Sequence, residues 1–392
     1  MKHLLISAML LSVLAFSGCA SEPKQPSEFE FEYNEYYEGY FLVAYNGDNP
    51  ELVVPAKYKN QPVIGISSVS GTNENVTVSR IVFPDSIKTI QFSFSFLTEL
   101  EEINLPNSLE EIIGSFGFQS SITTVDIPDS LKFIDHSFTG ENFTHINVGE
   151  GNPYYSSIDG VLFNKDKTEL WFYPAGKSER EYVVPDSVTR IGLNMFMNGD
   201  FNLTKIKLSA GFSGFFMWDV RTTYGDGRVQ NYDDLQNLGN PFSGCAFLEI
   251  IEVDENNQTF TSIDGILFSK DEKILFAYPP MRKGSSYTVP YGVEVISHGA
   301  FLQSYYDKSG EIIPIELNEV TLPSTITKLG PSNFLAIERL YIDMNEADWN
   351  ENVENWLRRH PSTEWIFNDS PPVTQTETEK PPETPDVIAP PE

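Results

Sequence analysis

One pattern recurs along the chain at a fixed interval. The segments IVFPDSIKTI, INLPNSLEEI and VDIPDSLKFI place Pro84, Pro106 and Pro128 at equivalent positions, 22 residues apart. Self-similarity at a period of this size is typical of solenoids, in which each repeat forms one rung. The repeat therefore predicts an architecture before any single residue is considered.

The first half of each repeat is expected to form a short strand. Ile103 and Leu105 flank a polar residue, which suits a strand with one buried face. Pro106 ends that strand because proline lacks the N–H for a further ladder bond, and the Asn-Ser or Asp-Ser pair that follows favours a turn. Eight such strands are predicted, centred on Ile81, Ile103, Val125, Ile146, Ile206, Ile251, Val320 and Leu340.

The second half of each repeat ends in a phenylalanine. Phe94, Phe116 and Phe138 are again 22 residues apart. No rung can bury its own apolar face, so stacked rungs should turn these rings into a ladder opposite the sheet. Phenylalanines at matching positions continue the series as Phe196, Phe242, Phe301 and Phe334. The pattern predicts a mainly β, right-handed solenoid over residues 67–342 with one parallel sheet of short strands.

The repeats also resemble a known family. LPNSLEEIIGSFGF and NPFSGCAFLEIIEV are similar to the BspA-like, Treponema-type bacterial leucine-rich repeats, whose pattern is IGxxAFxxCxxLxxIxLPxSL. The resemblance covers about residues 51–368 and implies a leucine-rich-repeat solenoid at the cell surface that binds or adheres to ligands. Two departures stand out, because most rungs lack the family's cysteine and Leu208-Ser209-Ala210 replaces the usual Leu-Pro.

The amino terminus is typical of an exported lipoprotein. Residues 1–18 have a basic start, an apolar run too short to span a bilayer and a small-residue cleavage site. The ending LAFSGC resembles a bacterial lipobox, which would make Cys19 the lipidated first residue of an envelope or cell-surface protein. An ordinary signal peptide with a stray cysteine is the alternative. Membrane contact is expected only through this anchor.

Caps and a tail are expected around the repeats. Residues 19–28 form a polar tether, and residues 29–66 a β cap with a hairpin around the turn 46–50. Residues 343–369 form a second cap, with a helix over 346–359 and a strand over 364–367. The Pro, Thr and Glu bias of residues 370–392 predicts a disordered tail.

Two insertions, 149–182 and 254–287, repeat each other at an offset of 105 residues. Each contains a β-hairpin that starts with Ser-Ile-Asp-Gly. The signature would fit a catalytic Asp159 or Asp264, but an Asp-Gly turn that opens the hairpin is the simpler explanation.

Composition argues against several functions. The formal net charge of −30 disfavours nucleic acid, because neutralising phosphates needs clustered Lys and Arg. Motifs of hydrolases, metalloproteases, P-loops and dinucleotide sites are missing from the sequence. Cys245 reads as a small buried hydrophobe. We therefore expect a non-catalytic protein with no cofactor and no metal site.

Candidate binding residues fall into two groups. Residues between the buried strand positions should point outward and line the exposed face of the sheet. They are Asn104, Asp126, Asn147, Lys207, Glu252, Thr321 and Tyr341. The irregular insertion 211–237 breaks the repeat and carries the aromatic residues Phe215, Phe216, Trp218 and Tyr224, on or near a hairpin pairing 220–224 with 228–232. Either these aromatics bind a ligand or they fold back onto neighbouring rungs as core.

The function favoured by these features is binding or adhesion to protein or glycan ligands on a concave solenoid face. A structural or accessory envelope lipoprotein that scaffolds other surface proteins is the alternative. An enzyme with its site hidden in an insertion is a third, weaker hypothesis.

Overall fold

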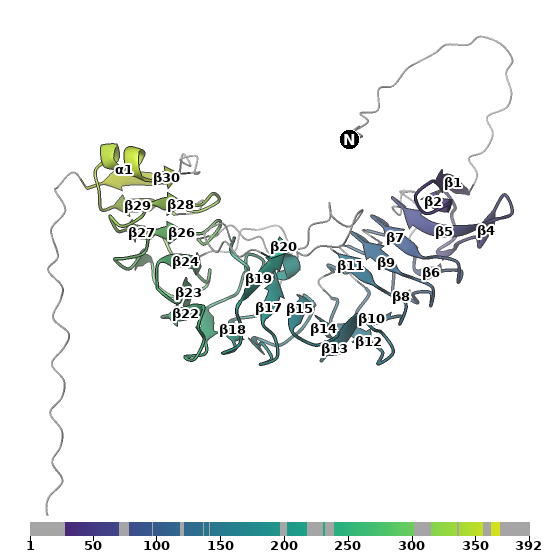
Figure 1. Ribbon diagram of the computed structural model, residues 1–392. Coiled ribbons are helices and arrows are strands. Elements are labelled where there is room, and N and C mark those ends of the chain that lie inside the picture. The colour runs from purple at the N-terminus through teal and green to yellow at the C-terminus, as the bar shows by residue number, and fades with distance from the viewer. Residues whose placement is uncertain are drawn as a thin grey trace, which may run out of the picture.

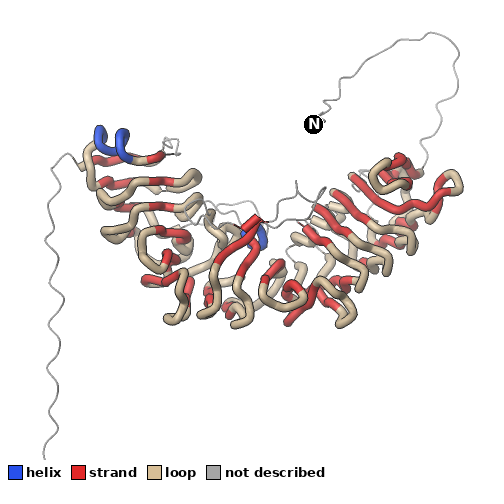
Figure 2. The backbone as a smooth tube through the Cα atoms, viewed as in Figure 1, coloured by secondary structure: helices blue, strands red, loops and turns tan. Residues whose placement is uncertain are grey.

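The structure is a computed structural model. It describes residues 28–69, 78–95, 97–117, 121–135, 137–140, 142–196, 202–217, 230–231, 239–301, 315–334, 337–355 and 362–368. Within them the chain winds into a β-solenoid of about 11 turns with parallel sheets. Figure 1 shows the rungs stacked into an arc, and Figure 2 shows how little helix it contains. The predicted β-solenoid architecture is confirmed.

All eight predicted strands are present and form what we call the outer ladder. They are β6 (Arg80–Val82), β8 (Glu102–Ile103), β10 (Thr124–Ile127), β12 (His145–Val148), β18 (Lys205–Leu208), β21 (Ile250–Val253), β27 (Glu319–Leu322) and β29 (Arg339–Ile342). Four more strands join them: β3 (Glu51–Val53), β16 (Glu181–Val183), β25 (Ser286–Thr288) and β31 (Glu364–Phe367). The ladder is divided into four sheets, ordered β3-β6-β8, β10-β12, β16-β18-β21 and β25-β27-β29-β31.

A second ladder, which we call the inner ladder, was not predicted. The aliphatic pair before each phenylalanine also pairs in parallel with its neighbours, as in Ile66↔Ile90 and Ile90↔Ile112. Its strands are β2 (Gly39–Tyr45), β5 (Gln61–Ser67), β7 (Thr89–Gln91), β9 (Glu111–Ile113), β11 (Phe133–Asp135), β15 (Glu169–Phe172), β17 (Arg190–Gly192), β19 (Gly214–Met217), β24 (Ile274–Ala277), β26 (Val295–Ile296), β28 (Lys328–Leu329) and β30 (Glu354–Asn355). The expectation of one sheet was therefore incomplete, because each rung contributes two strands.

The two ladders lie on opposite sides of the arc. In Figure 1, β7, β9, β26 and β28 line the inside of the curve, whereas β6, β8, β27 and β29 lie toward the outside. We expected the binding face to lie on the concave side of the solenoid. The outer ladder, which carries the predicted face residues, lies on the convex side, so that expectation is corrected.

Antiparallel hairpins start each section of the inner ladder. The first is β1 (Phe29–Asn34) with β2. The next two combine β13 (Tyr155–Ile158) and β14 (Val161–Asn164) with β15, and β22 (Phe260–Ile263) and β23 (Ile266–Ser269) with β24. Their last strands then pair in parallel with the following rung. The predicted hairpin insertions thus become part of the ladder.

The Asp-Gly pairs form the tight turns expected of them. Asp159 and Gly160 have φ of 49° and 79°, and Asp264 and Gly265 have φ of 50° and 81°. Two successive residues with positive φ are the signature of a type I′ hairpin turn, in which Gly and Asp are favoured. These aspartates are explained by backbone conformation.

Stacked phenylalanines fill the interior between the ladders. Phe94, Phe116 and Phe138 are buried, and their ring centroids lie 5.4 and 5.1 Å apart. All three have positive φ, between 57° and 61°, which turns each side chain back into the core. A similar, tilted ring contact recurs between Phe301 and Phe334, whose centroids lie 5.0 Å apart. The predicted phenylalanine ladder is confirmed.

A ladder of buried serines runs beside the phenylalanines. Ser93 Oγ accepts a hydrogen bond from the Val69 N–H, and Ser115 Oγ and Ser137 Oγ accept from the N–H of Ser93 and Ser115, each at 3.1 Å. The three hydroxyls donate to the carbonyls of Gln91, Ile113 and Asp135. Each serine therefore satisfies backbone groups that burial would otherwise leave unpaired.

Both caps differ in detail from the prediction. The amino-terminal hairpin turns at residues 35–38, where Asn34 Oδ1 accepts from the N–H of Tyr36 and Tyr37, and not at 46–50. Residues 46–50 instead cross from the inner to the outer ladder. The carboxy-terminal helix α1 (Glu346–Asn352) ends seven residues early, because Glu354 pairs with Lys328 as strand β30. Trp349, which the helical pattern missed, is its buried residue.

We predict that Phe116→Ala destabilises the protein by roughly 3 to 5 kcal/mol, because the ring is fully buried between two others and its loss leaves a cavity. Urea unfolding followed by circular dichroism measures this. Phe92→Ala is the matched control, since that ring is 58% exposed, and it should cost about 0.5 kcal/mol or less. A cost below about 1 kcal/mol at Phe116 would contradict the stacked core.

Candidate binding site on the outer ladder

The predicted face residues do lie on one side of the solenoid. Asn104, Asp126, Asn147 and Lys207 are exposed, and Glu252, Thr321 and Tyr341 are half-buried. Strand pairing places Asp126 beside Asn147, Lys207 beside Glu252, and Thr321 beside Tyr341. These pairs belong to three separate sheets, and Asn104 follows the strand of a fourth. The structure brings the seven residues to one face but not to one site.

Over most of this face the polar side chains bind one another. Asn147 Nδ2 donates to Asp126 Oδ1 at 2.9 Å, and Asn104 Nδ2 donates to Glu102 Oε1 at 2.7 Å. Glu252 Oε1 lies 2.7 Å from Nζ of Lys205 on the neighbouring strand. Exposed pairs of this kind add little stability, but they occupy groups that a ligand would otherwise use.

The carboxy-terminal sheet differs, because a pocket of about 550 Å³ opens on its outer face. In-register pairing sets Thr288, Thr321, Tyr341 and Ile366 side by side on four adjacent strands, β25, β27, β29 and β31. Two predicted residues, Thr321 and Tyr341, therefore line the pocket. The other lining residues are Thr288, Val289, Tyr291, Pro323, Ile342, Asp343, Ile366, Phe367 and Asn368.

Several polar groups of the pocket are available to a ligand. Among the described residues, the hydroxyls of Thr288, Tyr291, Thr321 and Tyr341 make no side-chain hydrogen bond. Asp343 Oδ1 accepts from Asn368 Nδ2 at 2.9 Å, which fixes the carboxylate at the rim. Tyr291 is 74% exposed, so its ring is accessible from solvent. The pocket combines aromatic surface with unused hydrogen-bonding groups.

Sequence reasoning missed most of this pocket. Asp343 follows Ile342 at a position where several other rungs have proline after the strand. Gly149, Ser209 and Asp254 also replace that proline, so the substitution was only a weak signal. Asn368 and Phe367 come from the last strand, β31, which the repeat pattern did not include. Tyr291 lies in a turn. Only stacking of the rungs brings residues 288 to 368 together.

The aromatic residues of the irregular insertion are core where the structure describes them. Phe215 and Phe216 are buried in β19, and the Phe215 ring lies 6.1 Å from that of Phe242. Their proposal as binding residues is therefore corrected. Trp218 and Tyr224 lie outside the described residues. Most of the expected hairpin, which pairs 220–224 with 228–232, also lies outside the described residues; of its second strand, Gln230–Asn231 forms β20, which pairs with β19.

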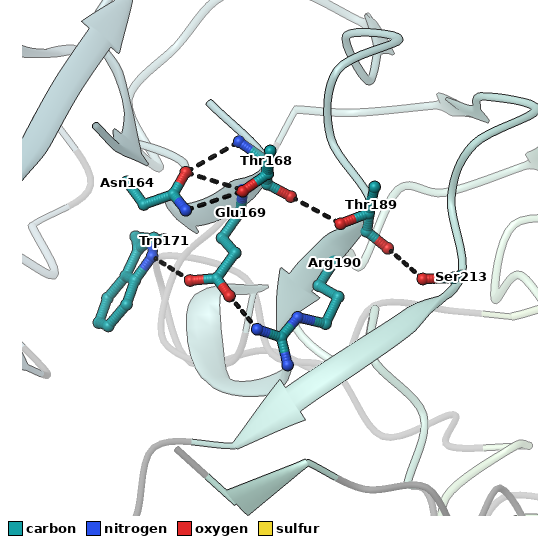
Figure 3. A network of polar contacts seen from close by, with 7 residues as sticks. All are labelled: Asn164, Thr168, Glu169, Trp171, Thr189, Arg190 and Ser213. Atoms are coloured by element: carbon teal, nitrogen blue, oxygen red, sulfur yellow. Dashed lines mark hydrogen bonds and ion pairs between the residues drawn. The ribbon is translucent and has the colours of Figure 1, made fainter. Parts of the chain in front are cut away.

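A polar network on β15 and β17 of the inner ladder was a second candidate (Figure 3). Glu169 forms an ion pair with Arg190 of the next rung and accepts from Trp171 Nε1 at 3.2 Å. The Arg190 guanidinium also stacks over the Phe216 ring at 5.7 Å. The network joins the inserted hairpin to the next rung. Because its charged groups are already paired with one another, it offers a ligand few available hydrogen-bonding groups.

Cys245 is fully buried, and burial raises the pKa of its thiol well above the ordinary value. It packs in the core cluster with Phe242 and Leu248. Within the part of the chain that the structure describes, no three His, Cys, Asp or Glu side chains converge on a possible metal position. None of the described helices is long and apolar enough to cross a membrane.

Comparison with known proteins agrees with this architecture. Two parallel ladders of short strands around stacked phenylalanines define a leucine-rich-repeat solenoid. Residues 70–170 match the BspA type leucine rich repeat region in six copies, so the repeats in this part of the chain are similar to that type. No curated protein matches the sequence.

Similar solved structures are distant. The pneumococcal vaccine antigen PcpA is 14% identical with a TM-score of 0.46, covering 88% of this chain and 98% of its own. A leucine rich cell surface protein from Faecalibacterium prausnitzii is 16% identical with a TM-score of 0.42, covering 86% and 99%. The leucine rich repeat protein of T. pallidum is 17% identical with a TM-score of 0.26, covering 50% and 86%.

We predict that Cys245 resists thiol reagents in the folded protein, because the thiol is inaccessible and its raised pKa disfavours the reactive thiolate. Labelling at pH 8 should be negligible in buffer and complete in denaturant, followed by mass spectrometry. A chain carrying Cys19→Ser isolates the signal from this thiol. Rapid labelling without denaturant would show that this part of the core opens.

Proposed function

We propose that the chain is a lipid-anchored cell-surface protein that binds protein or glycan ligands through its outer ladder and performs no catalysis. The observation that carries this proposal is the pocket around Thr321 and Tyr341. It gathers hydroxyls that have no hydrogen-bond partner among the described residues, at the end of a face whose other polar groups are largely paired. Unused hydrogen-bonding groups beside exposed aromatic surface are the usual composition of a ligand site.

The repeat class supports this proposal. A solenoid presents an extended surface on a scaffold held together by contacts between neighbouring rungs, so surface residues can vary without altering the fold. The convex side of the arc, rather than the expected concave side, carries the pocket. The formal net charge of −30 keeps the body of the protein away from anionic membrane surfaces, which suits attachment through a terminal lipid alone.

We predict that Cys19→Ser releases the protein from the membrane fraction, because thioether-linked acyl chains would supply the anchor. Fractionation of expressing cells, followed by immunoblotting, measures the distribution. Cys245→Ser is the matched control and should leave the protein in the membrane fraction. If the Cys19 variant stays with the membranes, the lipid anchor is wrong.

We predict that a screen against matrix proteins, host-cell proteins and glycans yields ligands whose binding falls on joint replacement of Lys207 and Tyr341 by alanine. Lys207 is exposed and Tyr341 half-buried, so the fold should tolerate both changes. Binding unaffected by this double replacement would move the site off the outer ladder. Binding lost only on deletion of residues 370–392 would instead favour the scaffolding lipoprotein.

A further inference from the structure

The pocket on the carboxy-terminal sheet has a regular arrangement of donors and acceptors. Thr288, Thr321 and Tyr341 occupy the same position on three adjacent strands, so their hydroxyl-bearing side chains recur at intervals of about 4.8 Å across the floor. None of these hydroxyls donates to a described side chain or carbonyl. A ligand with several hydroxyls of its own would complement such a row.

Aromatic and aliphatic surface accompanies these hydroxyls. Tyr291 is largely exposed and Tyr341, Ile366 and Phe367 are half-buried, all within the lining of one pocket. Tyrosine offers an apolar ring together with a polar tip, which suits ligands that have both kinds of surface. A pyranose has this character, because its C–H groups form an apolar face and its hydroxyls project from the edge.

The charge of the pocket restricts the ligand further. Among the described residues that line the pocket, Asp343 is the one carboxylic acid, and none is Lys, Arg or His. Asp343 Oδ1 is held by Asn368 Nδ2, which leaves the second carboxylate oxygen free to accept from a ligand hydroxyl in a charge-assisted hydrogen bond. A phosphate or a carboxylate would meet repulsion here and in the field of a chain with a net charge of −30.

A quaternary ammonium group would also suit one carboxylate and aromatic rings. It would, however, leave the row of threonine and tyrosine hydroxyls without partners. Buried or partly buried polar groups that lose water without gaining a partner weaken binding. The hydroxyl row therefore favours a polyhydroxylated ligand over a cation.

We infer that this pocket is a binding site for a neutral sugar residue. The sugar stacks its C–H face on an aromatic ring of Tyr291 or Tyr341, exchanges hydrogen bonds with the Thr288, Thr321 and Tyr341 hydroxyls, and donates a hydroxyl to Asp343. This inference rests on the proposed binding function and names its ligand class.

The test is saturation-transfer difference NMR and titration calorimetry on the purified full chain carrying Cys19→Ser. The probes are glucose, galactose and N-acetylglucosamine, with sialic acid, glucose 6-phosphate and choline for comparison. We expect a neutral sugar to bind, Tyr341→Ala and Asp343→Asn to weaken that binding at least tenfold, and Tyr341→Phe to weaken it less. Tyr154→Ala, at an exposed tyrosine outside the pocket, should leave the affinity unchanged.

The outcomes separate this inference from the proposed function. Tighter binding of the anionic probes or of choline overturns the neutral-sugar assignment, and sugar binding that survives the pocket variants overturns the location. A protein ligand blocked by Tyr341→Ala, with no sugar bound, overturns the sugar but retains the binding function. Absence of any ligand overturns both.

If Tyr341→Ala lowers the melting temperature, Thr321→Val is used instead, because it removes one hydroxyl of the row at similar side-chain volume.

Discussion

Stacking between neighbouring rungs is the interaction on which the whole structure depends. Phe116 is buried only because Phe94 and Phe138 cover its two faces, and the Ser115 hydroxyl accepts from the Ser93 N–H one rung away. Neither the apolar nor the polar interior of a rung is complete without the next. Stability is therefore a sum of nearest-neighbour terms, and the two ends require caps. The buried Trp349 of α1 and the β1–β2 hairpin supply them.

The hairpin insertions interrupt this regularity without breaking it. Asn152 and Asn257, both buried, show how. Each side-chain NH2 group donates to two carbonyls of the preceding rung, and each side-chain oxygen accepts from the N–H groups of the residues two and three positions later, where the next strand begins. The chain can leave the ladder here because one side chain replaces the missing backbone bonds. The core accordingly divides into three large clusters, one for each section of the inner ladder.

The sequence predicted the strands in which buried and exposed residues alternate, and it missed the strands that lack this alternation. The outer ladder followed from alternation around Ile103 and its equivalents. The inner ladder gave no such signal, because Thr89, Ile90 and Gln91 are all buried and a short strand buried throughout has no period of two. The predicted helix was too long because Val353, Trp356 and Leu357 continue the helical spacing that starts at Ala347. Val353 instead caps the helix and leads into β30. Phe215 and Phe216 looked available only because the repeat breaks around them.

The pocket was beyond prediction for a related physical reason. Its residues are separated by up to 80 positions, from 288 to 368, and the loops between them vary in length, so no fixed period connects them. What makes the pocket possible is the end of the repeat. Along the ladder, a polar residue such as Asp126 finds a partner in Asn147 one rung away, and the surface neutralises itself. Near the last strand, β31, fewer such partners remain among the described residues, and Asp343 stands at a position that proline occupies in several other rungs. Among the described residues of the outer ladder, polar groups without partners therefore collect near the last strand, where we propose that a ligand binds, rather than along the repeats that specify the fold.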